Sequence, residues 1–300
     1  MNEVAVINSV NFDFEKNPVE VMNLETLKRT FAENDITGKP LRGIYHFEVL
    51  ERLATLCDKH GLDYEIEEIF AAQNKNKVQP GVVVLPQVEK QFGQRAVEAH
   101  VLRRIFATIK IENWSNEEMS TTLVVTYTQD GIRMAIGPNV RVCHNQCILC
   151  ADRIVANFGK EKVTTEMLFE EVDRWLESLE SDTIRDRKRI DFLKNSVIEP
   201  KDLFTLIGIL TTMRVAHDSK DKKLSQQVET YPLNQGQISL FTERLLLLKQ
   251  QKEVITAWDV YNAATELYKP GKTDFPALIP QNWAFVQALF SFIGEELPNL

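Results

Sequence analysis

The sequence predicts an α+β protein: an N-terminal half with a mainly antiparallel sheet and a packed helix, joined to a C-terminal helical half. Two observations support this class. Between Asp63 and Ile136, apolar residues alternate with polar ones in several short stretches, which is typical of strands. After Gly159, apolar residues recur at helical spacing. We therefore expect two domains, residues 1–140 containing the sheet and residues 141–300 mainly helical and packed on it.

The N-terminal half is expected to begin with an extended segment, residues 1–22, and a short helix capped by Asn23. A helix from His46 to His60 follows, with Gly61 as its stop. The sequence then predicts strands in the segments 63–73, 81–85, 105–111, 121–128 and 132–136. Asp130-Gly131 between the last two predicts a hairpin turn, and Gly137-Pro138-Asn139 is expected to end the second strand.

The C-terminal half is expected to be helical from about Val142. The first helix is predicted to run through Val155 and to stop at Gly159. Pro200 is expected to open a later helix, because proline is favoured in the first helical turn. The remaining helices are predicted at residues 164–179, 182–197, 201–215, 235–250, 255–268 and 281–293.

Composition limits the classes of function. The 300 residues carry a net charge of −8, which argues against a wholly basic nucleic-acid binder but leaves room for a local basic patch. Four cysteines, three of them clustered, do not resemble a disulfide framework, so a reducing compartment is expected. The N-terminus lacks a signal-peptide pattern, and the longest apolar run, Phe204–Leu210, is too short to span a bilayer. We expect a cytoplasmic protein with no membrane partner.

Three cysteines, Cys143, Cys147 and Cys150, form a C-x3-C-x2-C pattern. This spacing is that of the iron–sulfur site of radical S-adenosylmethionine enzymes, so it raises a metal hypothesis. On a helix, however, the same spacing places the three thiols on one face, where cysteine packs as a small apolar residue. No glycine-rich segment follows to hold the cofactor. The packed stripe is favoured, and neither a metal ligand nor a cofactor is assigned.

Catalytic motifs are absent from the sequence. There is no phosphate-binding loop, dinucleotide fingerprint, zinc-protease motif or nucleophile elbow. The five histidines are scattered, and spacing indicates no partner carboxylate for any of them. The Arg185–Arg189 segment is interspersed with aspartates, which favours an exposed salt-bridged helix over a phosphate site. A non-enzymatic protein is favoured, with no catalytic residues assigned.

Three segments together resemble a known family. They are Val125–Gly131 with Asn139–Asn145, then Leu62–Glu67, and finally Thr256–Glu266. They are similar to phage/plasmid-like proteins of unknown function, encoded by mobile elements, and most of all to the Bacteroides-type branch. Gln129 stands where that family usually has histidine. The resemblance implies a mobile-element protein, and analogy with single-strand annealing proteins implies a role near recombination or replication.

The leading hypothesis is therefore a non-enzymatic mobile-element protein that binds nucleic acid, single strands above all. Its candidate contact residues are basic and lie on or beside predicted strands: Arg103, Arg104, Lys110, Arg133 and Arg141. One alternative is a protein that neutralises or redirects a host protein. A third is an iron–sulfur or metal enzyme that uses Cys143, Cys147 and Cys150. A homo-oligomer is compatible with each of these.

Overall fold

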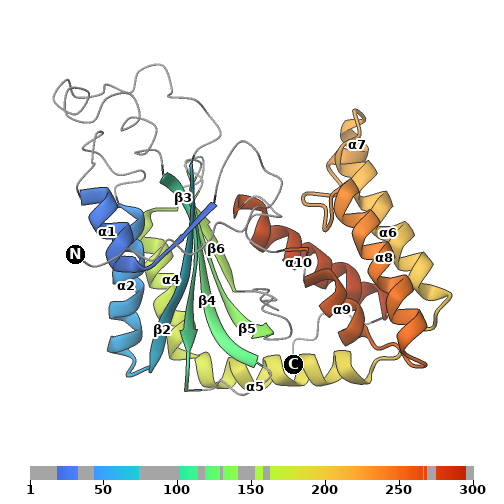
Figure 1. Ribbon diagram of the computed structural model, residues 1–300, viewed down its shortest axis with the longest axis horizontal. Coiled ribbons are helices and arrows are strands. Elements are labelled where there is room, and N and C mark those ends of the chain that lie inside the picture. The colour runs from blue at the N-terminus through green and yellow to red at the C-terminus, as the bar shows by residue number, and fades with distance from the viewer. Residues whose placement is uncertain are drawn as a thin grey trace, which may run out of the picture. The chain divides into compact units, whose positions relative to one another are not determined.

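The fold is α+β, as predicted, with a mostly antiparallel sheet in the N-terminal half and helices in the C-terminal half (Figure 1). The computed structural model describes residues 19–32, 44–73, 102–113, 119–128, 131–140, 153–157, 163–265, 267–268 and 275–294. The chain packs as two compact units. The first comprises residues 1–113, 122–135 and 154–177, and the second comprises residues 114–121, 136–153 and 178–300. Residues 154–177 thus cluster with the N-terminal sheet, beyond the predicted boundary at residue 140.

Six strands of the described chain form one sheet in which the spatial order follows the sequence. They are β1 (Val19–Met22), β2 (Tyr64–Gln73), β3 (Leu102–Ile111), β4 (Met119–Tyr127), β5 (Ile132–Val140) and β6 (Ile154–Asn157). β1 pairs with β2, β2 with β3 and β5 with β6, each antiparallel. Antiparallel neighbours need no crossover connection, and between β1 and β2 the chain forms two helices, Leu24–Ala32 and His46–Lys59.

The hairpin between β4 and β5 is confirmed. The Thr128 N–H donates to the Gly131 carbonyl at 2.8 Å, and the Gly131 N–H donates back at 3.2 Å. Gln129 and Asp130, between them, lie outside the described residues. The predicted end of the second strand at Gly137 was wrong, because β5 continues through Pro138 to Val140. Proline has a backbone angle compatible with a strand and lacks only the N–H, so a strand tolerates it where no ladder bond is needed.

The predicted helix over residues 142–155 was wrong at its C-terminal end. Ile154–Asn157 form strand β6, with Ile154 opposite Ala135 and Asn157 opposite Ile132. The β-branched pair Ile154-Val155 suits a strand, and the edge of β5 supplies the hydrogen-bonding partner that helical spacing in the sequence does not reveal. Residues 142–152 of that predicted helix lie outside the described chain, as does the predicted strand at 81–85.

Helices α1 (Leu24–Ala32), α2 (His46–Lys59) and α4 (Thr165–Glu177) gather on one side of the sheet in Figure 1. The predicted cap is confirmed, since the Asn23 side-chain oxygen accepts from the Thr26 N–H at 2.8 Å. α2 buries an apolar face that includes Cys57, and it ends at Gly61, whose φ is +63°. α4 contacts both α2 and β6. The first unit is therefore a sheet packed with three described helices.

The second unit is mainly helical. Its described helices are α5 (Leu179–Asn195), α6 (Asp202–His217), α7 (Lys222–Ser225), α8 (Gln235–Gln251), α9 (Ala257–Thr265) and α10 (Phe275–Phe292). An Asn234–Gln237 capping box starts α8, each residue's side chain bonding the other's backbone N–H at 2.9 Å. α9 packs on α5, α8 and α10, with Tyr261 fully buried. The Tyr261 ring stacks on the Trp258 ring with 5.7 Å between the ring centroids, so this aromatic pair contributes to the packing of α9.

Candidate functional site

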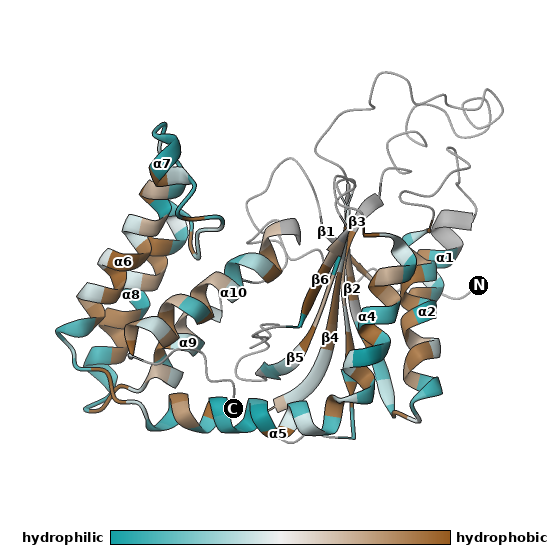
Figure 2. Ribbon diagram, turned by 180° about the vertical axis from the view of Figure 1, so that it is seen from behind, coloured by the Kyte–Doolittle hydropathy of each residue, from teal (hydrophilic) through white to brown (hydrophobic). Residues whose placement is uncertain are grey.

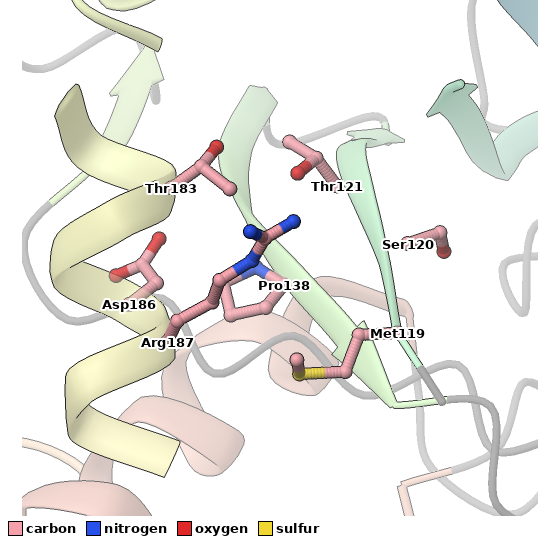
Figure 3. A pocket seen from close by; sticks show the side chains of 7 residues that line it. All are labelled: Met119, Ser120, Thr121, Pro138, Thr183, Asp186 and Arg187. Carbon is pink, nitrogen blue, oxygen red and sulfur yellow. The ribbon is translucent and has the colours of Figure 1, made fainter. Parts of the chain in front are cut away.

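A small pocket of the second unit contains the candidate site (Figure 3). It is lined by residues at the start of β4, near the end of β5 and on α5: Met119, Ser120, Thr121, Pro138, Thr183, Asp186 and Arg187. Three of these side chains carry hydroxyl groups. The pocket has a volume of about 10 Å³, which is room for roughly one water molecule.

One face of α5 supplies the charged wall of this pocket. Thr183, Asp186 and Arg187 are three and four residues apart, so they share a side of the helix. In Figure 3 the Arg187 guanidinium lies beside Pro138, between Thr121 and Thr183. Arg187 is exposed to solvent, whereas Asp186 is buried. The Thr183 hydroxyl donates its hydrogen to the Leu179 carbonyl at 2.8 Å, so the pocket presents an accessible guanidinium next to the hydroxyl groups of Ser120 and Thr121.

A buried ionic network lies behind this wall. Arg153 bridges the two aspartates of α5, binding Asp186 through Nη2 and lying 3.3 Å from Asp182 Oδ2 through Nη1. Arg185 Nη2 contacts Asp182 Oδ1 at 2.9 Å, and Arg189 Nη1 lies 3.3 Å from Asp186 Oδ1. Three guanidinium groups thus face two carboxylates, and these five side chains carry one net positive charge.

Burial dominates the electrostatics of Asp186. Removal from water raises the pKa of this carboxyl group, while the Arg153 and Arg189 guanidinium groups act in the opposite direction. A buried ion pair of this kind adds little net stability, but loss of one partner leaves an uncompensated charge. The network therefore fixes the position of α5, and with it Arg187, relative to the neighbouring strand ends of the second unit.

This arrangement suits binding of an anionic oxygen. Arginine and hydroxyl side chains are common partners of phosphate oxygens, and a guanidinium matches phosphate in a bidentate manner. The pocket is too small for a whole nucleotide. Its carboxylate, Asp186, already contacts two arginines and is poorly placed to act as a general base. The geometry thus favours binding of a single anionic group of a larger ligand, and it does not favour a catalytic role for the pocket.

The residues predicted from sequence as nucleic-acid contacts lie on different strands. Lys110, in β3, forms an ion pair with Glu112. Arg133, in β5, is half-buried and lies opposite Ala156 of β6. β4 separates these two strands in the sheet, so the described structure does not bring Lys110 and Arg133 together.

The other predicted contacts are described in part or not at all. Arg103 and Arg104 belong to β3, with Arg104 opposite Ala72, but their side chains lie outside the description. Arg141 lies entirely outside the described residues. A role for these arginines stays a prediction.

The three cysteines of the metal hypothesis, Cys143, Cys147 and Cys150, also lie outside the described residues. Within the described ranges, no group of three histidine, cysteine, aspartate or glutamate side chains could hold a metal ion. Cys57 is described and is fully buried on α2. Burial, with a smaller effect of Asp58, raises the pKa of its thiol to about 11, so this cysteine is neutral at physiological pH.

The sequence did not reveal the charged network or the pocket. The salt-bridged interpretation of the Arg185–Arg189 segment is correct for Arg185 and Arg189, but the ion pairs involve buried groups instead of an exposed face. Helical spacing alone could have predicted part of the network, because Asp182, Asp186 and Arg189 fall on one side of α5. Nothing in the spacing indicates Arg153, which lies in a segment predicted to be helical.

Comparisons with known proteins do not add to this description: no family model, curated protein or solved structure matches the chain. Among the helices of the described ranges, none combines the length and the apolar character needed to cross a membrane.

Proposed function

We propose that this chain is a non-enzymatic mobile-element protein that binds single-stranded nucleic acid through backbone phosphates, in recombination or replication. The observation that supports this most directly is the exposed Arg187 beside Thr121 in the pocket, next to a buried network of arginines and aspartates. Contacts of this type bind phosphate without reading sequence. The similarity to phage/plasmid-like proteins supports the setting, and membership of that family is part of the proposal.

The test is fluorescence anisotropy with labelled single- and double-stranded oligonucleotides at low and near-physiological salt. We expect a single-strand preference that persists at near-physiological salt. Because the whole chain is acidic, at −8, binding depends on local contacts and weakens as salt rises. Absence of binding at low salt, where attraction is least screened, would end the nucleic-acid proposal.

Two neighbouring residues of α5 offer a matched pair of variants. Arg187→Ala removes the pocket guanidinium, and Lys188→Ala removes the same charge from an exposed residue that does not line the pocket. Loss of one phosphate contact is expected to lower the slope of log affinity against log salt by about 0.7 for a single strand. Equal effects of the two variants would show that overall charge, and not the pocket, controls binding.

The arginines predicted from sequence require a separate variant. If Arg133 and Arg141 also contact the strand, replacing both by alanine weakens binding and flattens its salt dependence further. Unchanged binding by this double variant removes Arg133 and Arg141 from the proposed surface and leaves the α5 pocket as its centre.

A protein partner is the second candidate function, and exposed apolar residues of α8 favour it. Leu240 and Leu247 are 48% and 47% exposed and are seven residues apart, so they form a line along one side of the helix. Such lines are typical anchors of helix-mediated contacts. A host protein captured at a fixed stoichiometry should be lost with Leu240→Glu plus Leu247→Glu but retained with Met167→Glu on α4. Capture that both variants retain equally would exclude this surface.

The iron–sulfur alternative has an inexpensive test of its own. Purification under anaerobic conditions, followed by iron and sulfide analysis and a visible absorption spectrum, reports directly on Cys143, Cys147 and Cys150. Protein without iron, sulfide or an absorption shoulder would exclude the cluster. Stoichiometric iron and sulfide would instead replace the binding proposal with an enzymatic one.

A further inference from the structure

Helix α6 has an exposed face with no charged residue of its own, although Lys249 Nζ of α8 lies 5.9 Å from the ring centre of Phe204. It buries only a narrow stripe, Leu203, Leu206 and Leu210. Phe204, Ile209 and Val215 are exposed by 53%, 36% and 63% respectively. The single charged residue from Phe204 to Ala216 is Arg214, whose guanidinium lies 4.2 Å from the ring centre of Tyr231. Figure 2 shows the apolar character of α6 along its length.

A solvent-facing helix normally carries charged residues on its outer side, and a helix that is apolar all round is normally covered. Neighbouring α5 follows the usual pattern, with Glu180, Arg187, Lys188 and Asp191 exposed. Phe204 and Val215 are eleven residues apart and so share one side of α6, whereas Ile209 lies on another side. Two exposed large apolar side chains on one side of a helix indicate a surface that contacts another molecule.

We propose that the exposed face of α6 binds a second copy of this chain, with the two α6 helices antiparallel about a two-fold axis near the middle of the helix. In this register residue 204 faces residue 215 of the second copy, and residue 208 faces residue 211. The two-fold axis then generates both contacts twice, as a closed dimer requires.

The sizes of the side chains fit this register. Phe204 and Val215, large and exposed, lie towards opposite ends and would pack against each other across the axis. Gly208 and Thr211, near the middle, are small. A Cβ atom built on Gly208 meets no atom within 4 Å, so the centre of this face is open to a close helix–helix approach.

The charges at the ends of α6 favour the antiparallel direction. Lys201 is exposed just before the helix and Asp218 is exposed just after it. In the proposed register Lys201 faces Asp218 of the second copy. A parallel arrangement would instead place like charges side by side. Asp218 already accepts from His217 and contacts Arg214, but its side chain is 51% exposed and a carboxylate has room for a further donor.

The size of the interface sets its expected strength. A helix of 16 residues is roughly 24 Å long, so one helix pair buries less than the area of about 800 Å² per partner typical of stable complexes. A dimer that dissociates in the micromolar range is therefore expected. This inference is independent of the nucleic-acid proposal, because it concerns another helix and another kind of measurement.

Sedimentation velocity of the full 34.5 kDa chain across the micromolar range tests the proposal. We expect a shift from monomer to dimer as concentration rises. Val215→Glu and Phe204→Glu should each give monomer, with unchanged circular dichroism. Val254→Glu is the matched control, since Val254 is exposed to a similar extent, 57%, but lies outside α6, and this variant should still dimerise. A wild-type chain that is monomeric throughout, or equal effects of Val215→Glu and Val254→Glu, would overturn the proposal.

A charge reversal tests the register. Lys201→Glu and Asp218→Lys are each expected to weaken the dimer about tenfold, because each places like charges together across the interface. The double variant restores opposite charges and should recover most of the loss. Failure of the double variant to recover dimerisation would exclude the antiparallel register.

Discussion

His60 Nε2 lies 2.7 Å from Asp173 Oδ1, although 113 residues separate the two side chains in the chain. The neighbouring Lys59 Nζ binds the other oxygen of the same carboxylate at 2.6 Å. These contacts join the end of α2 to α4 within the first unit. Hydrogen bonds from Lys59, then from His60, hold the pKa of Asp173 below its usual value of 3.8. One carboxylate thus ties two helices together.

Asp173→Asn is expected to lower the free energy of unfolding by about 1 kcal/mol at neutral pH, the upper range for partly exposed ion pairs. A depressed folded-state pKa stabilises the protein above the unfolded value near 3.8, and this contribution is lost as pH falls through the lower folded value. The difference from wild type should therefore shrink in acid below pH 3.8. Urea unfolding at neutral and acid pH measures this difference in the free energy of unfolding. Glu170→Gln, on an exposed side of α4, is the control. A difference that persists unchanged in acid would contradict this account.

Cys57 is predicted to resist alkylation in the native protein. Its thiol is fully buried on α2, and its pKa of about 11 leaves almost no thiolate at the mildly basic pH of such reactions. Mass spectrometry after brief iodoacetamide treatment should find Cys57 unmodified, and the same treatment in denaturant should modify it. Rapid native modification would mean that α2 opens far more often than its packing indicates.

Tyr127→Phe is expected to destabilise the protein by about 1–3 kcal/mol. The Tyr127 hydroxyl donates to the Ile44 carbonyl at 2.8 Å in a buried position, and its removal leaves that carbonyl unsatisfied. Tyr231→Phe is a suitable control because its ring, which contacts Arg214, is retained. Chemical unfolding compares the two. A loss with Tyr127→Phe no larger than with the control would show that water reaches the Ile44 carbonyl.

Much of this fold is predictable because the determining interactions are local. The Asn23 cap, the apolar stripe of α2 and the hairpin between Thr128 and Gly131 each depend on residues a few positions apart. β6 is different. Ile154-Val155 fits helical or strand spacing in such a short segment, and pairing with β5 decides between them.

The candidate site is less predictable, because it depends on distant residues. Arg153 and Asp186 are 33 positions apart, and no local pattern links a residue just before β6 to the middle of α5. Spacing likewise gives no reason to pair His60 with Asp173. Basic residues on strands were visible in the sequence, but the ion pair of Lys110 with Glu112 depends on side-chain positions that the sequence does not specify.

Arg153→Met is expected to destabilise the protein by about 3–5 kcal/mol, because it leaves the buried Asp182 and Asp186 carboxylates without their shared partner. Arg187→Gln, in contrast, changes an exposed side chain and should alter the free energy of unfolding by less than about 0.5 kcal/mol. Urea unfolding of both variants separates the structural arginine from the proposed binding arginine. A large destabilisation by Arg187→Gln would assign Arg187 to the network and remove its proposed role in binding.

Gly208→Ala is predicted to stabilise the protein by about 0.5–1 kcal/mol. Glycine in a helix interior loses more conformational freedom on folding than alanine, and the new methyl group on α6 meets no atom within 4 Å. Urea unfolding at low protein concentration isolates this effect from association. Gly236→Ala is the control. Gly236 lies in the first turn of α8, where the preference for alanine over glycine is weaker than in a helix interior, and its added Cβ lies 3.5 Å from Asn234 Oδ1. The gain in the free energy of unfolding should therefore be smaller at this position. A loss of stability with Gly208→Ala would mean that this face of α6 is already covered within the single chain, and would also count against its pairing with a second copy.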